Sequence, residues 1–115
     1  MEFLFIISHD SAFRPDPKLL SDIRAWNETA EAEGIRVDGK PLEPASAAVT
    51  VRLRDGKEKI DLAPFSTSEE QMCAYELVRC GGMDEAVALA KTHPMARAAT
   101  IEVRPVWSAL EVAAT

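Results

Sequence analysis

The sequence predicts an α+β domain built on one antiparallel sheet, with two helices on a single face. Segments with the continuous or alternating apolar pattern of strands are separated by only two segments with apolar residues at helical spacing. These elements follow one another in the order β-α-β, a hairpin, and β-α-β. Two helices can cover only one face of a sheet of five or six strands. The second face must therefore be exposed to water or covered by a partner.

The first strand and helix occupy residues 3–34. Residues 3–8 form a continuous apolar run, which is typical of a central strand covered on both faces. Asp16 can cap a helix that begins at Pro17, where the missing N–H of proline costs nothing. Gly34 is expected to end this helix in the usual position after the C-cap. The helix presents one apolar stripe, formed by Leu19, Ile23, Trp26 and Ala30.

An edge strand and a hairpin fill the middle of the chain. Residues 35–37 begin a second strand, which the Asp38-Gly39 turn interrupts and two nearby prolines restrict to an edge. Apolar and polar side chains then alternate over residues 49–54, the pattern of a half-buried strand. Asp55-Gly56 closes a hairpin onto residues 57–62.

A second strand–helix–strand unit completes the domain. Residues 72–79 are predicted to form a strand and residues 83–92 a helix, which His93-Pro94 ends. We expect His93 to lie at the helix C-terminus, where a positive imidazole interacts favourably with the helix dipole. Residues 100–106 form the last strand.

Length and charge limit what the protein can do. A chain of 115 residues has the size of one domain, which we place at residues 1–106 with a tail at residues 107–115. The 13 basic and 19 acidic residues give a net charge of −6, and no basic stripe is present to bind nucleic acid. The apolar run at the N-terminus is shorter than the about 20 residues that span a membrane, and it lacks the features of a signal peptide. We therefore expect a soluble, cytoplasmic protein with no nucleic-acid or membrane partner.

Residues that could form a disulfide, a metal site or a phosphate-binding loop do not occur at the spacing that these features require. Cys73 and Cys80 lie on one predicted strand with side chains on opposite faces, so both should remain free thiols. The sequence contains no HxH, HExxH or CxxC motif and no glycine-rich phosphate loop. We expect neither a metal nor a cofactor.

Charged side chains are predicted on the uncovered face of the sheet. In the last strand Ile101 and Val103 would face the helices, which places Glu102 and Arg104 on the other side. In the hairpin strand, Arg52 lies on the same side as the other polar residues, so it would join Glu102 and Arg104 on the uncovered face. One interpretation is a solvated face with cross-strand ion pairs worth about 0.2–1 kcal/mol each. The other is a polar cleft closed by a second subunit, in which arginines bind a carboxylate or phosphate.

His9 and Asp10 are the candidate acid–base groups. They directly follow the first strand, and loops at strand ends often carry functional residues. Histidine titrates near neutral pH, and a dyad would need a carboxylate within about 3 Å of the imidazole. The alternative is that His9 is an ordinary loop residue and Asp10 a turn former or cap. Phe65 and Tyr75 also have two interpretations, because each can wall an apolar pocket or belong to the core.

Several short motifs occur in an order that resembles one family. They are Pro64-Phe65, Glu69 or Glu70, Tyr75, Asp84-Glu85-Ala86, and the segment from Glu102 to Pro105. Together they are similar to the YCII-related family, often named for its DGPF motif. The chain departs from that motif, because Leu62-Ala63 stands where the family has Asp-Gly. The turn is expected to differ, since the lost glycine tolerates positive φ.

The resemblance implies a ferredoxin-like α+β domain that pairs sheet to sheet with a second copy. The implied assembly is a homodimer, a dimeric α+β barrel with a cleft on the uncovered face. Asp10 resembles a family carboxylate that follows the first strand. Related proteins have been proposed to use a His-Asp pair for acid–base work.

Three functions remain open. The first is binding of a small anionic organic molecule, such as an organic acid, in a cleft at the dimer interface. The second is a cofactor-independent acid–base enzyme of the isomerase, lyase or dehydrochlorinase type, in which His9 transfers a proton and Asp10 orients it. The third is a structural or regulatory interaction module. The residues expected to line the ligand site are Arg52, Phe65, Tyr75, Glu102 and Arg104.

Overall fold

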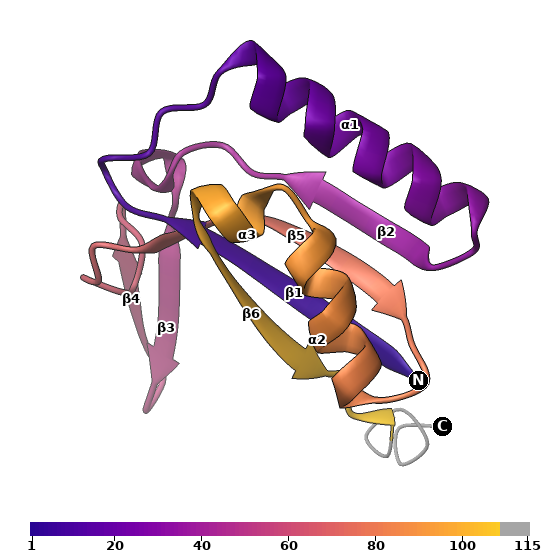
Figure 1. The fold of residues 1–115 in the computed structure, drawn as a ribbon. Helices are drawn as coiled ribbons and strands as arrows, with labels where there is room; N and C mark the ends of the chain where they lie inside the picture. The colour runs from indigo at the N-terminus through magenta and orange to yellow at the C-terminus, as the bar shows by residue number, and fades with distance from the viewer. Residues whose placement is uncertain (109–115) are drawn as a thin grey trace.

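A computed structural model describes residues 1–108 and has the predicted α+β fold. Four antiparallel strands form the main sheet in the order β2-β5-β1-β6, which is that of a ferredoxin-like domain. These strands are β1 (Glu2–His9), β2 (Arg36–Pro41), β5 (Gln71–Arg79) and β6 (Thr100–Pro105). Two helices and a short third one lie on one face of this sheet (Figure 1). These helices are α1 (Pro17–Ala32), α2 (Met83–Thr92) and α3 (Met95–Ala98).

The core lies between the helices and the main sheet. The buried side chains of β1 are Phe3, Phe5 and Ile7. They face the helices because alternate residues of a strand share a face. Ile101 and Val103 of β6 pack against them, as predicted. Leu4 and Ile6 point to the opposite face and are only half-buried, so one chain does not cover both faces of β1 as the apolar run suggested.

Helix α1 begins and ends at the residues that the sequence indicates. The Asp16 Oδ1 atom accepts a hydrogen bond of 2.7 Å from the Leu19 N–H, and Pro17 occupies the first helical position. Gly34, which follows the C-cap, has a φ of +73° that glycine adopts without steric cost. Helix α2 also has the predicted bounds.

Strand β2 differs from its prediction because it continues through Asp38 and Gly39 without a turn. A bulge between Arg36 and Asp38 shifts its register against β5. Gly39 is buried opposite Glu76, and a side chain at this position would collide with Glu76 and Arg36. The glycine is therefore required for space, and the sequence signal was misread as a turn.

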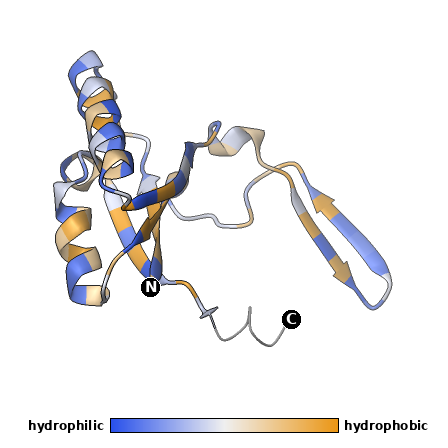
Figure 2. Ribbon diagram, turned by 90° about the vertical axis from the view of Figure 1, so that its right-hand side faces the viewer, coloured by the Kyte–Doolittle hydropathy of each residue, from blue (hydrophilic) through white to orange (hydrophobic). Residues whose placement is uncertain are grey.

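The hairpin forms a sheet of its own. Strands β3 (Thr50–Arg54) and β4 (Lys57–Asp61) pair only with each other, after a short 3-10 helix η1 (Ala45–Ala47). The hairpin projects from the side of the main sheet opposite the helices (Figure 2). Within one chain, Arg52 therefore does not join Glu102 and Arg104 on the uncovered face. The alternation of apolar and polar residues predicted which face of the hairpin carries Arg52. It could not predict that the hairpin forms a sheet separate from the main one.

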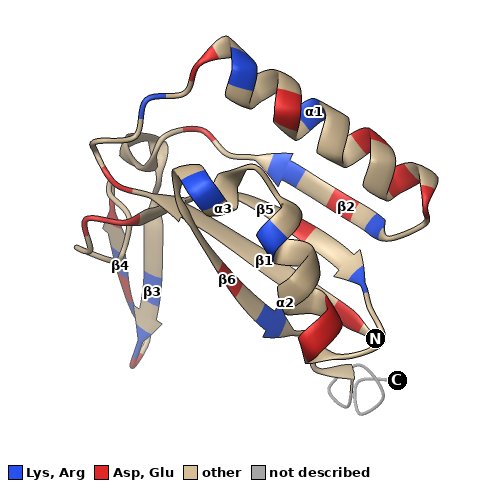
Figure 3. Ribbon diagram, viewed as in Figure 1, with Lys and Arg blue, Asp and Glu red and all other residues tan. Residues whose placement is uncertain are grey.

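Charged residues of both signs are interspersed along the described ribbon (Figure 3). No helix within residues 1–108 is long and apolar enough to cross a membrane. Cys73 and Cys80 are free thiols, as predicted. Trp107 is exposed. Residues 109–115 of the predicted tail lie outside the described residues, so the domain boundary at residue 106 stays a prediction.

The Asp16 cap provides a test of this fold. Asp16→Ala removes the acceptor of the Leu19 N–H, and we expect it to lower the free energy of unfolding by about 1 kcal/mol. Asp16→Asn keeps an acceptor and should lose clearly less. Urea denaturation of both variants measures the two losses. Equal losses would show that the carboxylate acts through its charge rather than through this hydrogen bond.

Candidate functional site

A cavity of about 320 Å³ lies between α1 and the helix-facing side of the main sheet. Its walls are mostly apolar, as is usual for sites that bind small organic molecules. They come from β1, α1, β2, β5 and α3, so segments that are distant in the sequence meet there. The apolar side chains of the lining include Ile7, Phe13, Leu19, Ile23, Ala74 and Met95.

A buried ion pair forms part of the cavity wall. Glu76 of β5 is only 5% exposed. Arg36 of β2 binds both of its carboxylate oxygens, with Nε 3.0 Å from Oε2 and Nη2 3.2 Å from Oε1. Arg36 also donates to the Gly39 carbonyl at 2.9 Å and to the Glu31 carboxylate. A buried carboxylate needs such partners, because its loss of hydration costs several kcal/mol.

The pKa values of Glu76 and Arg36 both differ from their ordinary values. Burial raises the pKa of Glu76 above its usual range, in spite of the opposing effect of Arg36. Hydrogen bonds to Glu76 raise the pKa of Arg36, so the guanidinium stays charged. While Glu76 is ionised, the two groups add no net charge to the cavity. A carboxyl group with a raised pKa beside a cavity is a frequent property of acid–base sites.

His93 follows α2 and lines the same cavity, with only 3% of its surface exposed. Its Nδ1 atom accepts a hydrogen bond of 3.0 Å from the Met95 N–H, so the neutral ring carries its proton on Nε2. The Nε2 atom lies 3.9 Å from Glu76 Oε2, which is too far for a hydrogen bond. This geometry leaves the Nε2–H available to a ligand.

The environment of His93 corrects the expectation of a charged helix terminus. Burial, and then the positive charge of Arg36, lower the pKa of His93 from 6.5 to about 4. The side chain is therefore neutral near physiological pH. The physical reason is the turn between α2 and α3, where His93, Pro94 and Met95 are buried together.

Asn27 of α1 supplies an unpaired acceptor. Its side-chain Oδ1 atom is buried and has no hydrogen-bond partner among residues 1–108. A buried polar atom without a partner costs about 1–3 kcal/mol, and such atoms are rare in folded proteins. A ligand that donates a hydrogen bond to Asn27 would remove this cost. Asn27 can thus offer an acceptor to a ligand in the cavity, and His93 can offer a donor.

His9 is the only predicted site residue in the lining of this cavity. Its ring stacks on Phe13, with 4.4 Å between the ring centroids. The His9 Nδ1 atom lies 2.9 Å from the Asp10 backbone carbonyl, so Nδ1 is a donor there and Nε2 keeps its lone pair. The Asp10 carboxylate accepts instead from the Ala12 N–H at 2.9 Å. The two side chains form no dyad in this chain, and Asp10 acts as a turn former.

Three of the other predicted site residues lie on the uncovered face of the main sheet. Glu102 and Tyr75 both pair with Ile6 of β1, and Arg104 Nε is 3.7 Å from Glu102 Oε2. The Tyr75 hydroxyl donates to Asp38 at 3.4 Å. The structure thus brings these three residues together, but on the face opposite the cavity.

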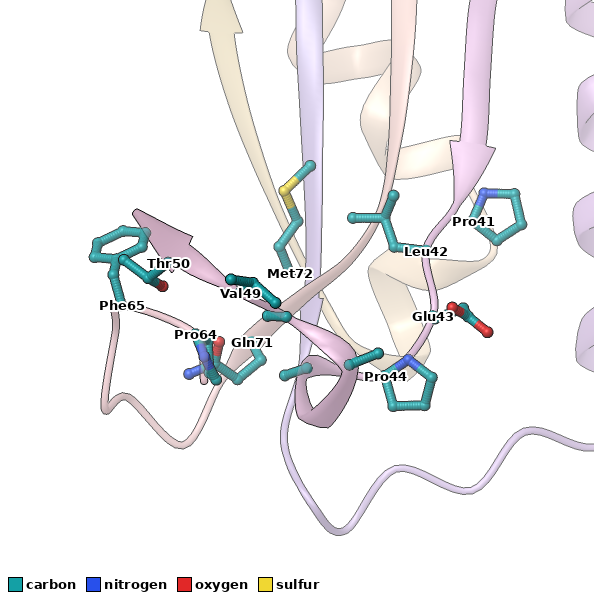
Figure 4. A pocket seen from close by; sticks show the side chains of 13 residues that line it. Pro41, Leu42, Glu43, Pro44, Val49, Thr50, Pro64, Phe65, Gln71 and Met72 are labelled. Carbon is teal, nitrogen blue, oxygen red and sulfur yellow. The ribbon is translucent and has the colours of Figure 1, made fainter. Parts of the chain in front are cut away.

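Arg52 and Phe65 lie apart from both groups. Arg52 Nη1 is 3.2 Å from Asp61 Oδ2 on the hairpin. Phe65 is 77% exposed and is not part of the core. It lines an open groove of about 540 Å³ at the base of the hairpin, together with Val49 and Met72 (Figure 4). Phe65 therefore walls a groove, but Tyr75 does not line it.

No group of three or more His, Cys, Asp or Glu side chains within residues 1–108 is arranged to hold a metal ion. The polar groups of the cavity are suited to hydrogen bonding and proton transfer.

Comparison with known proteins places the chain in a family. The YCII-related domain family matches residues 1–109. The chain belongs to this family. An uncharacterised protein of Rhizobium meliloti (strain 1021) is 29% identical over 92 residues, which are 78% of this chain and 74% of that protein. The resemblance indicated by the motifs is thus confirmed.

One solved structure shares the fold of this YCII-related domain. It is 5-chloro-2-hydroxyhydroquinone dehydrochlorinase (TftG) from Burkholderia phenoliruptrix AC1100, in complex with 2,5-dihydroxybenzoquinone. The TM-score is 0.53 at 16% sequence identity, and the match covers 93% of this chain and 94% of TftG. The predicted fold class is confirmed by this likeness and by the strand order of the main sheet.

Sequence reasoning missed the polar groups of the cavity. One signal was readable, because Glu76 has the same parity as Ala74 and Val78 and therefore lies on the inward face of a core strand. Such a carboxylate requires a nearby cation. No local pattern indicates that this cation is Arg36, which lies 40 positions earlier in the chain.

The buried His93 predicts a characteristic dependence of stability on pH. Between pH 6.5 and about 4 the unfolded chain takes up a proton on this histidine that the folded chain does not. The free energy of unfolding should therefore fall as the pH is lowered through this window, by on the order of 3 kcal/mol. Glu76 acts with the opposite sign, because its raised pKa lets the folded chain bind a proton first.

Comparison of wild type with His93→Asn separates the two groups, since Glu76 is present in both. Asparagine can still accept a hydrogen bond from the Met95 N–H. Urea denaturation at several pH values should show a steeper loss of stability in the wild type. Identical pH profiles would mean that His93 is not held neutral in the folded protein.

Proposed function

We propose that this domain binds a small, uncharged ring compound with hydroxyl groups in the cavity between α1 and the main sheet. The observation that carries the proposal is an apolar cavity whose wall holds an unpaired acceptor and an available donor. Hydroxyl groups can donate to Asn27 Oδ1 and accept from His93 Nε2–H. The volume of about 320 Å³ is at the lower end of the range of about 300–1,000 Å³ for ligand sites, which suits a single ring.

The charges at the cavity favour an uncharged ligand over the organic acid predicted from the sequence. Arg36 is already bound to Glu76, Glu31 and the Gly39 carbonyl, so it offers little to a further anion. An anion in the cavity would also face the Glu76 carboxylate at low dielectric, where repulsion is strong. Lys40 lines the cavity but is exposed to water.

The likeness to TftG supports a ring-shaped ligand. That protein is named for a chlorinated trihydroxybenzene and is solved with 2,5-dihydroxybenzoquinone, and both compounds are single rings with oxygen substituents. The hydroxyl groups of the quinone are vinylogous acids and ionise in neutral water, whereas a simple phenol keeps its proton because its pKa is about 10. Comparing the binding of the ionised quinone with that of a neutral phenol therefore tests which ligand charge the cavity prefers.

Titration calorimetry with resorcinol and hydroquinone tests the proposal on the wild type and on Asn27→Leu. The substitution removes the acceptor while it keeps the shape of the side chain, and we expect an affinity about threefold to tenfold lower. Benzoate and 2,5-dihydroxybenzoquinone should bind more weakly than the phenols. Arg104→Ala is the matched control, because Arg104 lies on the other face of the sheet.

Two outcomes contradict the proposal in different ways. If Arg104→Ala abolishes binding and Asn27→Leu does not, the ligand occupies the uncovered face and the dimer-interface prediction gains support. If the carboxylate and the quinone bind while the phenols do not, the cavity is selective for anions.

A second candidate function is a cofactor-independent acid–base enzyme acting on the same class of ring. Its specific support is that His9, Glu76 and His93 line one cavity, with a raised pKa at Glu76. His9 Nε2 has the free lone pair that a general base needs. Loss of HCl from a chlorinated hydroquinone would first need a proton on the ring carbon that carries the chlorine, which gives a keto tautomer. A base would then remove a hydroxyl proton as the carbon–chlorine bond breaks and chloride leaves.

Chloride release from 5-chloro-2-hydroxyhydroquinone measures this activity. If His9 is the base, His9→Ala should reduce the rate by about 10²–10⁴. Asp10→Asn should change the rate little, because the Asp10 carboxylate bonds to the Ala12 N–H and not to the imidazole. An unchanged rate in His9→Ala removes His9 from the mechanism and leaves Glu76 as the candidate.

Asn27 and His93, which carry the proposal, line the cavity within one protomer, so the proposed contacts need no residue of a partner. Homodimer formation, the cytoplasmic location and a role as an interaction module stay predictions of the sequence.

A further inference from the structure

Two deeply buried polar side chains lie close together in the cavity wall without a direct hydrogen bond. Glu76 of β5 is 5% exposed and His93 is 3% exposed, and both line the cavity of about 320 Å³. The His93 Nε2 atom is 3.9 Å from Glu76 Oε2. This distance is too long for a direct hydrogen bond, but it suits two atoms that share one bridging group.

The surroundings of each side chain fix its role in hydrogen bonding. His93 Nδ1 accepts from the Met95 N–H, so Nε2 carries the proton and acts as a donor. Arg36 donates to both oxygens of Glu76, which is the arrangement of an ionised carboxylate, so Oε2 acts as an acceptor. A carboxylate oxygen has two lone pairs, and Arg36 Nε occupies only one of those on Oε2. One donor and one acceptor therefore remain side by side for a ligand.

Neighbouring side chains hold both groups in position. The His93 ring lies against Trp26 of α1, with 4.6 Å between the ring centroids. The indole N–H of Trp26 in turn donates to the Thr92 hydroxyl at 2.9 Å. The two contacts with Arg36 fix the plane of the Glu76 carboxylate. A ligand thus meets a donor and an acceptor that are already in place, which lowers the entropic cost of binding.

A single hydroxyl group can satisfy both atoms at once. An oxygen about 2.8 Å from both Nε2 and Oε2 would see them at an angle of roughly 90°. A hydroxyl oxygen can accept from the His93 N–H while its own hydrogen points to the Glu76 carboxylate. A carbonyl oxygen has lone pairs but no hydrogen. It would leave Oε2 without its second partner and would bring two electron-rich atoms together.

We propose that Glu76 and His93 select a ring with a free hydroxyl group and reject the same ring with a carbonyl group at that position. The cavity would then bind a hydroquinone and exclude the corresponding quinone. This inference rests on the proposed function, because it requires that the ring enters this cavity. Asn27, which lines the same cavity, has an unpaired acceptor that also needs a hydrogen from the ligand. A hydroquinone brings two such hydrogens and a quinone brings none, so the reaction that supplies the ligand must deliver the ring in its reduced form.

Titration calorimetry of the wild type with three uncharged rings of similar size tests the proposal. Hydroquinone carries two hydroxyl groups, cyclohexane-1,4-dione carries two carbonyl groups, and 1,4-difluorobenzene keeps the planar aromatic ring with two weak acceptors. Neither acceptor compound alkylates the thiol of Cys73, which also lines the cavity and which a quinone would modify. Hydroquinone should bind about tenfold or more tightly than either, because both acceptor compounds leave the buried Glu76 oxygen unpaired.

Matched substitutions at two glutamates assign the selectivity to Glu76. Glu76→Gln introduces an amide that can donate as well as accept, so the preference for hydroquinone over the dione should fall about threefold to tenfold. Glu58→Gln is the control on the exposed hairpin and should keep the wild-type preference. Arg36→Met/Glu76→Gln leaves no unpaired charge and replaces the single variant if that variant does not fold.

The outcomes separate this inference from the proposed function. If the wild type binds hydroquinone and binds the dione equally well, the proposed function stands and the selectivity is wrong. An unchanged preference in a folded Glu76 variant also overturns the inference. A wild type that binds no hydroquinone contradicts the proposed function, and this inference falls with it.

Discussion

The buried carboxylate of Glu76 is the constraint on which much of this domain depends. It lies on the inward face of the central strand β5, where an unpaired charge would be strongly destabilising. Arg36 reaches it from β2 across a strand bulge, and the approach is open only because residue 39 is glycine, since a Cβ there would lie 2.6 Å from Arg36 Nη2. The same pair lies at the cavity wall and helps to keep His93 neutral. One ion pair thus connects the edge strand β2 to the cavity wall and influences the pKa of His93.

The helices cover only one face of the main sheet, so the two faces of the sheet differ in what they can bind. The cavity lies on the helix side of the sheet. There α1 and α3 pack against the sheet around several polar groups and leave a space that no side chain fills. The opposite face keeps half-buried apolar residues, and the hairpin of β3 and β4 projects from this side (Figure 2). The proposed ligand site and the pairing of copies that the family resemblance implies therefore use different faces.

Local signals predicted the elements whose ends depend on neighbouring residues. Asp16, Pro17 and Gly34 fixed the ends of α1, and the alternation of β6 gave the correct inward residues. Long-range pairing was less accessible, because nothing near Arg52 indicates that its hairpin forms a separate sheet, and nothing near His93 indicates that it is buried. The candidate site was predicted only at His9. Its other polar groups meet through contacts between distant segments, although the inward parity of Glu76 was visible in the sequence.

The location of a bound phenol tests the central claim most directly. Amide and side-chain NMR spectra recorded during a titration with resorcinol would report on both faces of the sheet in one experiment. The account predicts the largest shifts at the Asn27 side-chain amide, at the His93 ring and at Ile23, with little change at Ile6 and Arg104. Shifts confined to Ile6, Glu102 and Arg104 would contradict it and would place the ligand on the face where copies of the chain are expected to meet.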